Sequence, residues 1–170
     1  MSGVEPVIRI PVGVVIERRR AKSAWADFVW RPVAVLTGVP DAAPWTALEG
    51  DAECMTFYGG SAEIVLHRAD ASGYRENLGG GAALLWVAMR PTDTEPYHEI
   101  AAVTAEPSEG EALTENASHI VETVPMPELV RVAVAEFVVA HYVEQPFIKR
   151  QREHADPEVM ARGRLFKDRR

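Results

Sequence analysis

The chain of 170 residues has a single cysteine, Cys54, and therefore cannot form a disulfide bond within itself. A chain of this length can bury enough apolar surface to fold without disulfides or structural metal ions. Sparse cysteine is typical of proteins from reducing compartments. The N-terminus has no basic segment followed by an apolar core and a cleavage site, so we expect no signal peptide and a cytoplasmic location.

Long apolar runs and an excess of positive charge are also missing. The longest apolar stretch, in residues 127–144, is interrupted by Arg131 and Glu136, so no segment reaches the roughly 18 residues of a membrane-spanning helix. The formal net charge is −7, and residues 1–146 hold ten Lys/Arg against 21 Asp/Glu. An acidic body disfavours nucleic acid as a partner, because contacts with phosphate dominate that affinity.

The motifs of metal sites and of common catalytic centres are missing as well. The five histidines lie 13 to 31 residues apart along the chain, so no two share a helical turn and none has a metal-ligand spacing. The glycines at 79–81 are not followed by Lys-Ser/Thr and precede an expected strand, unlike those of a phosphate-binding loop. We therefore expect no metal, no cofactor and no catalytic residues, and the sequence makes no positive case for an enzyme.

Residues 127–144, PELVRVAVAEFVVAHYVE, predict one long helix. Pro127 suits the first helical position, and Pro146 stops the helix from continuing. The interior is apolar on nearly all sides, far beyond the stripe of a surface helix. We expect the inner face to pack on a sheet, with Phe137 in the core. The outer face is expected to be covered by chain segments, by a partner or by a second copy, which would give a homodimer.

Most of the chain before this helix predicts β-strands. The expected strands cover residues 7–17, 28–39, 55–58, 61–68, 82–89 and 97–106. The first two suggest an antiparallel pair, and Gly59-Gly60 predicts a two-residue hairpin turn. Residues 41–51 are expected to form a loop, and residues 118–124 a link to the helix. Together they predict an α+β fold, in which a curled antiparallel sheet of about six strands packs on one long C-terminal helix.

Two clusters of positive charge stand out against the acidic body. The first follows the first strand and consists of Arg18, Arg19, Arg20 and Lys22. The second begins a basic tail, residues 149–170, which we expect to be flexible and to lie outside a single globular domain of residues 1–148. A solvated strand end is the common meaning of such a cluster. If the long helix runs antiparallel to the first strand, the two clusters could instead form one anion-binding patch.

Several short blocks of the chain resemble a known family. The blocks are IPVGVVIERRR, WRPVAVL, APWTAL, YRENL, VPMPE and FVVAHYVEQPFIKRQR. In the same order and spacing, over about residues 10–152, they resemble a proteobacterial family labelled domain of unknown function 3305. Genes of that family are often found beside those for formate dehydrogenase subunits and maturation proteins. The resemblance therefore implies an accessory or assembly role for a molybdenum-containing or tungsten-containing formate dehydrogenase, and it supplies no catalytic residues.

These observations favour a non-enzymatic accessory protein that acts through protein–protein contacts, with formate dehydrogenase or its maturation proteins as the partner. Aromatic and arginine side chains are enriched at such contacts. The candidate partner-binding residues are Arg19, Arg20, Trp25, Trp45, Lys149, Arg150 and Arg152. The alternative is a small-molecule binding protein or enzyme in molybdenum-cofactor handling. Its nucleotide or pterin would lie in the mouth of the curled sheet, held by Arg31, Tyr58, Arg68 or Arg75.

Overall fold

The computed structural model describes residues 7–144 and 146, which form seven strands and three α-helices. The strands are β1 (Val7–Arg20), β2 (Phe28–Thr37), β3 (Thr46–Gly50), β4 (Cys54–His67), β5 (Leu84–Pro91), β6 (His98–Thr104) and β7 (Ile120–Pro125). The helices are α1 (Ala71–Gly79), α2 (Pro107–Thr114) and α3 (Glu128–His141), with a 3-10 turn, η1 (Arg68–Asp70), before α1. The predicted α+β class is confirmed.

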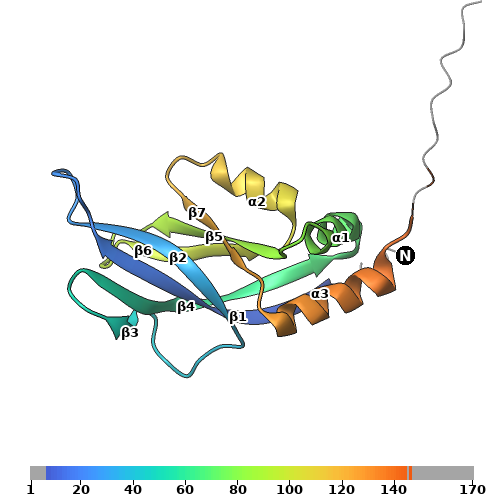
Figure 1. Ribbon diagram of the computed structural model, residues 1–170, viewed down its shortest axis with the longest axis horizontal. Coiled ribbons are helices and arrows are strands. Elements are labelled where there is room, and N and C mark those ends of the chain that lie inside the picture. The colour runs from blue at the N-terminus through green and yellow to red at the C-terminus, as the bar shows by residue number, and fades with distance from the viewer. Residues whose placement is uncertain (1–6, 145, 147–170) are drawn as a thin grey trace, which may run out of the picture.

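The strands form two antiparallel sheets rather than one. The first sheet has the order β2-β1-β4-β3, and the second has the order β6-β5-β7. They face each other, with β2 beside β7 and β4 beside β6 (Figure 1). The expectation of one curled sheet of about six strands is wrong. The chain leaves the first sheet after β4, passes through α1 and begins the second sheet with β5, so each sheet is built from one continuous part of the described chain.

Strand β1 is an inner strand of the first sheet and pairs with two neighbours. It pairs with β4 over nearly its whole length and with β2 from Gly13 onwards, which confirms the predicted antiparallel pair. Pro11 lies in β1 before Gly13, where the pairing with β2 begins. Its carbonyl accepts a hydrogen bond from the Gly38 N–H at 3.2 Å. The missing Pro11 N–H points to the same side, so the proline removes no bond from a strand ladder.

The predicted hairpin turn at Gly59-Gly60 is wrong. Both glycines lie inside β4, where Gly60 pairs with Val14 and Tyr58 pairs with Val15. Gly59 is therefore the extra residue of a β-bulge. Gly60 has φ +132°, a backbone conformation that favours glycine. A side chain on Gly59 would approach Ile16 to 2.5 Å. The glycines are needed for a bulge and a close approach, and not for a chain reversal.

Two further strands occupy segments that the sequence predicts to be a loop and a link. Strand β3 pairs with β4 at the edge of the first sheet, and all five of its residues are exposed. Such a strand has no alternation of apolar and polar residues from which to predict it. Strand β7 pairs with β5 from Leu84 to Met89, so β5 is the central strand of its sheet, as predicted.

Helix α3 is shorter than predicted, because it begins at Glu128 and ends at His141. Pro127 is the residue before the helix and not its first residue. The buried face packs into one core with both sheets, and Phe137, at 1% exposure, is in the core as predicted. In the described part of the chain, no helix is long and apolar enough to cross a membrane.

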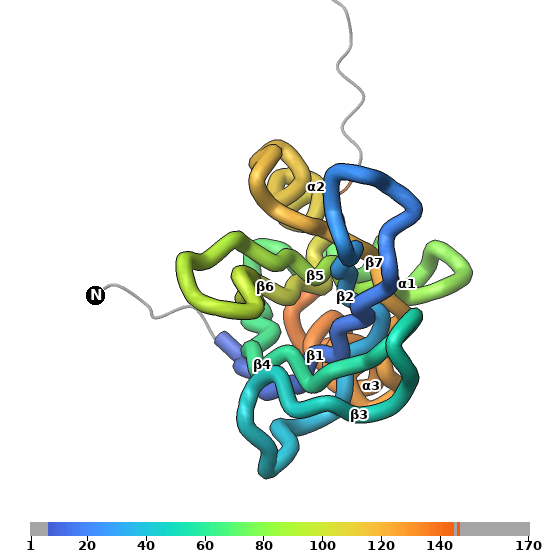
Figure 2. The backbone as a smooth tube through the Cα atoms, turned by 90° about the vertical axis from the view of Figure 1, so that its left-hand side faces the viewer, coloured from blue at the N-terminus to red at the C-terminus, as the bar shows by residue number. Residues whose placement is uncertain are grey.

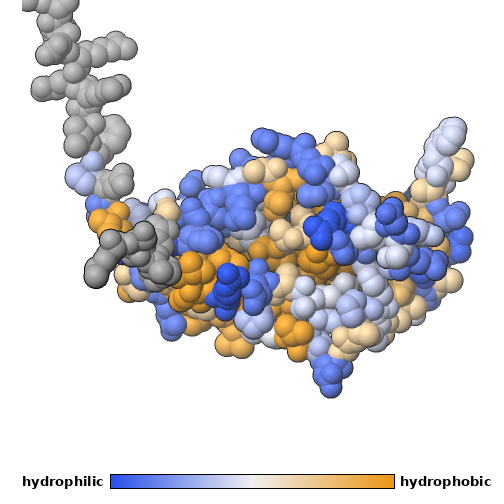
Figure 3. All heavy atoms as spheres, turned by 180° about the vertical axis from the view of Figure 1, so that it is seen from behind, coloured by the Kyte–Doolittle hydropathy of each residue, from blue (hydrophilic) through white to orange (hydrophobic). Residues whose placement is uncertain are grey.

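The outer face of α3 keeps apolar side chains at the surface. Leu129 and Val139 are 68% and 86% exposed, and Val143, which follows the helix, is 70% exposed. Within residues 7–144 and 146, no segment covers them. On the face turned away in Figure 1, orange patches of hydrophobic residues lie between blue and white hydrophilic ones (Figure 3). The cover predicted for the outer face of α3 is therefore not supplied by the described residues.

Candidate functional site

The candidate site lies at the end of the two sheets opposite the end of α3. The loops that connect β1 to β2, β3 to β4 and β5 to β6 meet there (Figure 1), and Figure 2 looks at the molecule from this side. The Arg20 N–H donates to the Glu53 carbonyl at 2.8 Å, which holds the first two loops together. We call this region the loop end. Trp25 is at the β1–β2 connection and is 96% exposed.

Two predicted partner-binding arginines lie on β1 at the loop end, and both are exposed. Arg19 pairs with Glu17 at 3.2 Å, and Arg20 pairs with Glu53 at 3.1 Å. Glu17 also receives Arg31 at 3.1 Å. Burial raises the pKa of Glu17, but the hydrogen bonds from Arg19 and Arg31 outweigh that effect, so the pKa is lowered. These arginines are therefore partly neutralised by carboxylates of the same surface.

Arg18 lies on the opposite face of β1 from Glu17 and Arg19 and packs among aromatic rings. Its guanidinium carbon is 4.4 Å from the centre of the Phe28 ring and 5.2 Å from that of Phe57. Trp30 lies 5.8 Å away and is itself packed edge-on against Trp45, at 5.6 Å. A cation against aromatic faces is stabilised by the ring quadrupoles. The arginine and the four rings form a unit, which we call the Arg18 cluster.

An open pocket of about 550 Å³ lies over the Arg18 cluster. It is lined by Arg18, Asp27, Phe28, Trp30, Trp45, Phe57, Glu95, Pro96 and Tyr97. Trp45 and Tyr97 have φ of 70° and 68°, and among the described residues they are the non-glycine positions with positive φ. Such backbone conformations cost free energy and gather at binding sites. The volume is within the range of small-ligand and side-chain pockets.

The predicted partner-binding residues are only partly brought together. Arg19, Arg20 and Trp25 share the loop end, whereas Trp45 is half-buried against the core as part of the Arg18 cluster. Lys149, Arg150 and Arg152, like the whole predicted tail, lie outside the described residues. The end of α3 lines an open pocket together with the segment around Arg68 and Ser72. That segment follows the end of β4 that pairs with Val7, at the far end of β1 from Arg19. The predicted union of the two basic clusters involves residues outside the described chain and stays a prediction.

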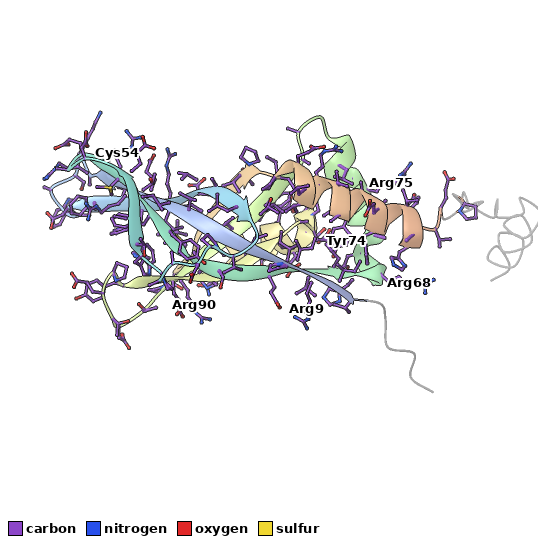
Figure 4. The ribbon with its side chains drawn as sticks, turned by 90° about the horizontal axis from the view of Figure 1, so that it is seen from below. Arg9, Cys54, Arg68, Tyr74, Arg75 and Arg90 are labelled. Carbon is purple, nitrogen blue, oxygen red and sulfur yellow. The ribbon has the colours of Figure 1, made fainter. Side chains whose placement is uncertain are left out.

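The four residues of the small-molecule alternative do not converge. Tyr58 is buried in the core at 2% exposure, and Arg31 is engaged by Glu17. Arg68 and Arg75 lie near the end of α3, far from Cys54 at the loop end (Figure 4). The Arg75 guanidinium packs on the Tyr142 ring at 4.6 Å and donates to its hydroxyl at 3.1 Å. The structure therefore does not form the pocket that this set of residues was expected to make.

The residue that sequence reasoning missed is Arg18. The signal was the two-residue period of β1, because Val12, Val14 and Ile16 are completely buried and Arg18 is next on that face. Treating the four cations as one solvated cluster concealed this alternation. The described residues contain no group of three or more His, Cys, Asp or Glu side chains that could hold a metal ion.

Comparison with protein families matches residues 11–151 to the family described as "Protein of unknown function (DUF3305)". The match covers all of the loop end and all three helices. The corresponding searches among curated proteins and solved structures give no match. Because the family match spans most of the sequence, the chain belongs to the DUF3305 family.

Proposed function

We propose that the protein is a non-enzymatic accessory or assembly factor that binds a larger protein through its loop end. The observation that carries the proposal is the exposure of Trp25, at 96%, beside the arginines of β1. An indole held in water has no role in the stability of the isolated fold. Tryptophan and arginine dominate the binding energy of many protein interfaces. The loop end therefore has the composition of a contact surface.

The partner that we propose is a molybdenum-containing or tungsten-containing formate dehydrogenase or one of its maturation proteins, in the cytoplasm. The proposal draws on the family resemblance and its implied gene neighbourhood. It is compatible with the acidic body, with formal net charge −7, which disfavours nucleic acid as a competing partner. The exposed Trp25 and the arginines of β1 support a protein partner, because such side chains are enriched at protein contacts.

Replacing Trp25 with alanine should weaken partner binding by about thirtyfold, because truncating an interface hot spot costs about 2 kcal/mol or more. The stability of the free protein should change by less than about 0.5 kcal/mol, since the side chain is 96% exposed. The measurement is a binding titration against the purified partner, with thermal unfolding of both variants. Unchanged affinity would remove Trp25 from the interface.

The second apolar surface, the outer face of α3, supports a proposal of self-association. Leu129, Val132 and Val139 are exposed, and their spacings of three and seven residues place them along one stripe of α3. A second copy that packs α3 against α3 would bury this stripe. Such a homodimer would leave the loop end free, and so it is compatible with the accessory role.

Replacing Val139 with glutamate should weaken self-association about tenfold or more, because a charge would enter an apolar contact. The monomer should keep its stability, since Val139 is 86% exposed. Light scattering after size-exclusion chromatography over a range of concentrations gives the measurement. A wild-type protein that is monomeric at every concentration would refute the homodimer. Trp25→Ala is the matched control, since it changes another exposed apolar residue outside α3.

The alternative function is binding of a nucleotide or pterin in molybdenum-cofactor handling. The pocket over the Arg18 cluster favours it, because aromatic rings and a guanidinium suit a planar ligand. Asp27 and Glu95 line the same pocket and would repel the phosphate groups of such ligands. The small-molecule role therefore takes second place to the protein partner.

A further inference from the structure

We propose that the pocket over the Arg18 cluster binds a carboxylate that lies next to an apolar side chain in a polypeptide segment of the partner. This inference rests on the proposed function, since it names the chemistry of the partner at the loop end. The pocket is separate from the predicted contact residue Arg19, which lies on the other face of β1. Arg20 lies on the same face as Arg18, and its guanidinium carbon is 5.7 Å from the centre of the Phe28 ring. The occupant of the pocket follows from three features of the lining residues.

The first feature is the lack of a carboxylate on Arg18. The other arginines of β1 each have one within 3.2 Å, in the pairs Arg9–Glu63, Arg19–Glu17 and Arg20–Glu53. In the described part of the chain, Arg18 forms no ion pair, and its buried Nε has no hydrogen-bond partner. A buried N–H without an acceptor is costly. A carboxylate is the acceptor that fits a guanidinium best, with two parallel hydrogen bonds.

The second feature is the apolar wall. Trp30, Trp45 and Phe57 line the pocket beside Arg18, with ring centres 5.6 to 6.4 Å apart. Partly exposed aromatic surface of this kind can bind an apolar side chain and exclude water from the ion pair. Tyr97, which is 56% exposed and lines the same pocket, can contact such a side chain.

The third feature is the presence of two acidic residues, Asp27 and Glu95, in the lining. Neither lies within the 4.0 Å of an ion pair with Arg18. They disfavour a ligand with several negative charges, such as a polyphosphate. They are good acceptors for amide N–H groups. A peptide segment supplies all three complementary groups at short spacing, since it carries a carboxylate, an apolar side chain and backbone N–H donors.

The test uses the full chain and three small probes. N-acetyl-phenylalanine has the carboxylate, the ring and the amide, N-acetyl-phenylalaninamide lacks the charge, and phenylacetate lacks the amide. Trp30 and Trp45 report binding through their fluorescence in a Trp25→Phe background, which removes the exposed indole. We expect saturable binding of N-acetyl-phenylalanine. N-acetyl-phenylalaninamide should bind at least about tenfold more weakly, in line with the strength of a charged hydrogen bond.

Arg18→Gln should remove the preference for the acid over the amide. Arg9→Gln is the matched control, because Arg9 lies on the same strand but is paired with Glu63, and it should keep the preference. If Arg18→Gln fails to fold, the comparison of acid and amide on the unsubstituted pocket still decides. Equal binding of the two, or no saturable binding of either, would overturn the carboxylate site. Equal affinity for phenylacetate would overturn the assignment to a polypeptide.

The probe experiment and the Trp25→Ala experiment can fail separately, so they distinguish the carboxylate site from the accessory role. If the probes do not bind but Trp25→Ala still weakens the partner, the accessory role stands and the pocket is not its contact. If the probes bind through Arg18 but no protein partner requires the loop end, the pocket is a binding site and the accessory role fails.

Discussion

Replacing Phe137 with alanine is expected to lower the free energy of unfolding by about 3 to 5 kcal/mol. Phe137 is 1% exposed on the inner face of α3. Its ring packs edge-on against Tyr74, at 5.9 Å between ring centres, and lies 4.5 Å from His141. Removing the ring leaves a cavity where α1 and α3 meet, in addition to the lost transfer free energy. Urea denaturation followed by circular dichroism measures the change.

The control for this prediction is Val139→Ala on the same helix. Val139 is 86% exposed, so its truncation should change the stability by less than about 0.5 kcal/mol at concentrations where the protein is monomeric. A loss below about 1 kcal/mol for Phe137→Ala would contradict its position in the core. Such a result would also question the packing of α3 against α1.

The second large effect is expected for Asn77→Ala. The Nδ2 atom of this buried residue donates to the carbonyls of Leu84 and Ala105, each at 2.8 Å, and its Oδ1 accepts from the Leu84 N–H at 3.1 Å. One side chain thus joins α1 to the chain on either side of the β5–β6 pair. Truncation leaves two carbonyls and an N–H without partners, so we expect a loss of about 3 kcal/mol or more.

Thermal and urea unfolding would measure this loss, with Glu76→Ala as the control. Glu76 precedes Asn77 on α1 and is exposed, so its replacement should be nearly neutral. Asn77→Asp should not rescue the protein, because a carboxylate oxygen would face a carbonyl in place of the amide donor. If Asn77→Ala were as stable as Glu76→Ala, the three hydrogen bonds would not hold the second sheet to α1.

The parts of the fold that the sequence predicts are those set by local patterning. The β1–β2 pair, the apolar β5 and the apolar helix α3 follow from periodicity and flanking prolines. The division into two sheets depends on pairing between β4 and β1 and between β5 and β7. Those pairings join residues far apart in the sequence, so no local pattern reports them. A single curled sheet and two facing sheets share the same local signals.

The glycine pair at 59–60 illustrates a real ambiguity. Two glycines between β-rich runs suit a tight hairpin and a bulge equally well, because both use backbone conformations that favour glycine. The bulge forms because β1 is long enough to pair with β4 on both sides of it. The glycine pair itself carries no information on the length of the partner strand, so the local sequence favours a turn where the fold has a bulge.

The candidate site divides in the same way. Trp25 and the arginines of β1 could be proposed from composition alone, since exposed aromatics and cations mark contact surfaces. The Arg18 cluster needed the cross-strand register that places Trp30 opposite Arg18, and it also needed the β5–β6 loop that brings Tyr97 to the pocket. The neighbours of Arg18 come from β2, the β2–β3 connection, β4 and the β5–β6 loop, so spacing within one segment cannot reveal them.

Affinity purification of the tagged protein from its native host, with mass spectrometry and cofactor analysis of the eluate, tests the central claim most directly. Parallel purification of Trp25→Ala makes the comparison specific to the loop end. We expect formate dehydrogenase subunits or their maturation proteins to copurify at near-stoichiometric levels with the unsubstituted protein and to be lost with the variant. Recovery of the protein alone, carrying a bound nucleotide or pterin, would contradict this expectation and assign the pocket to a small molecule.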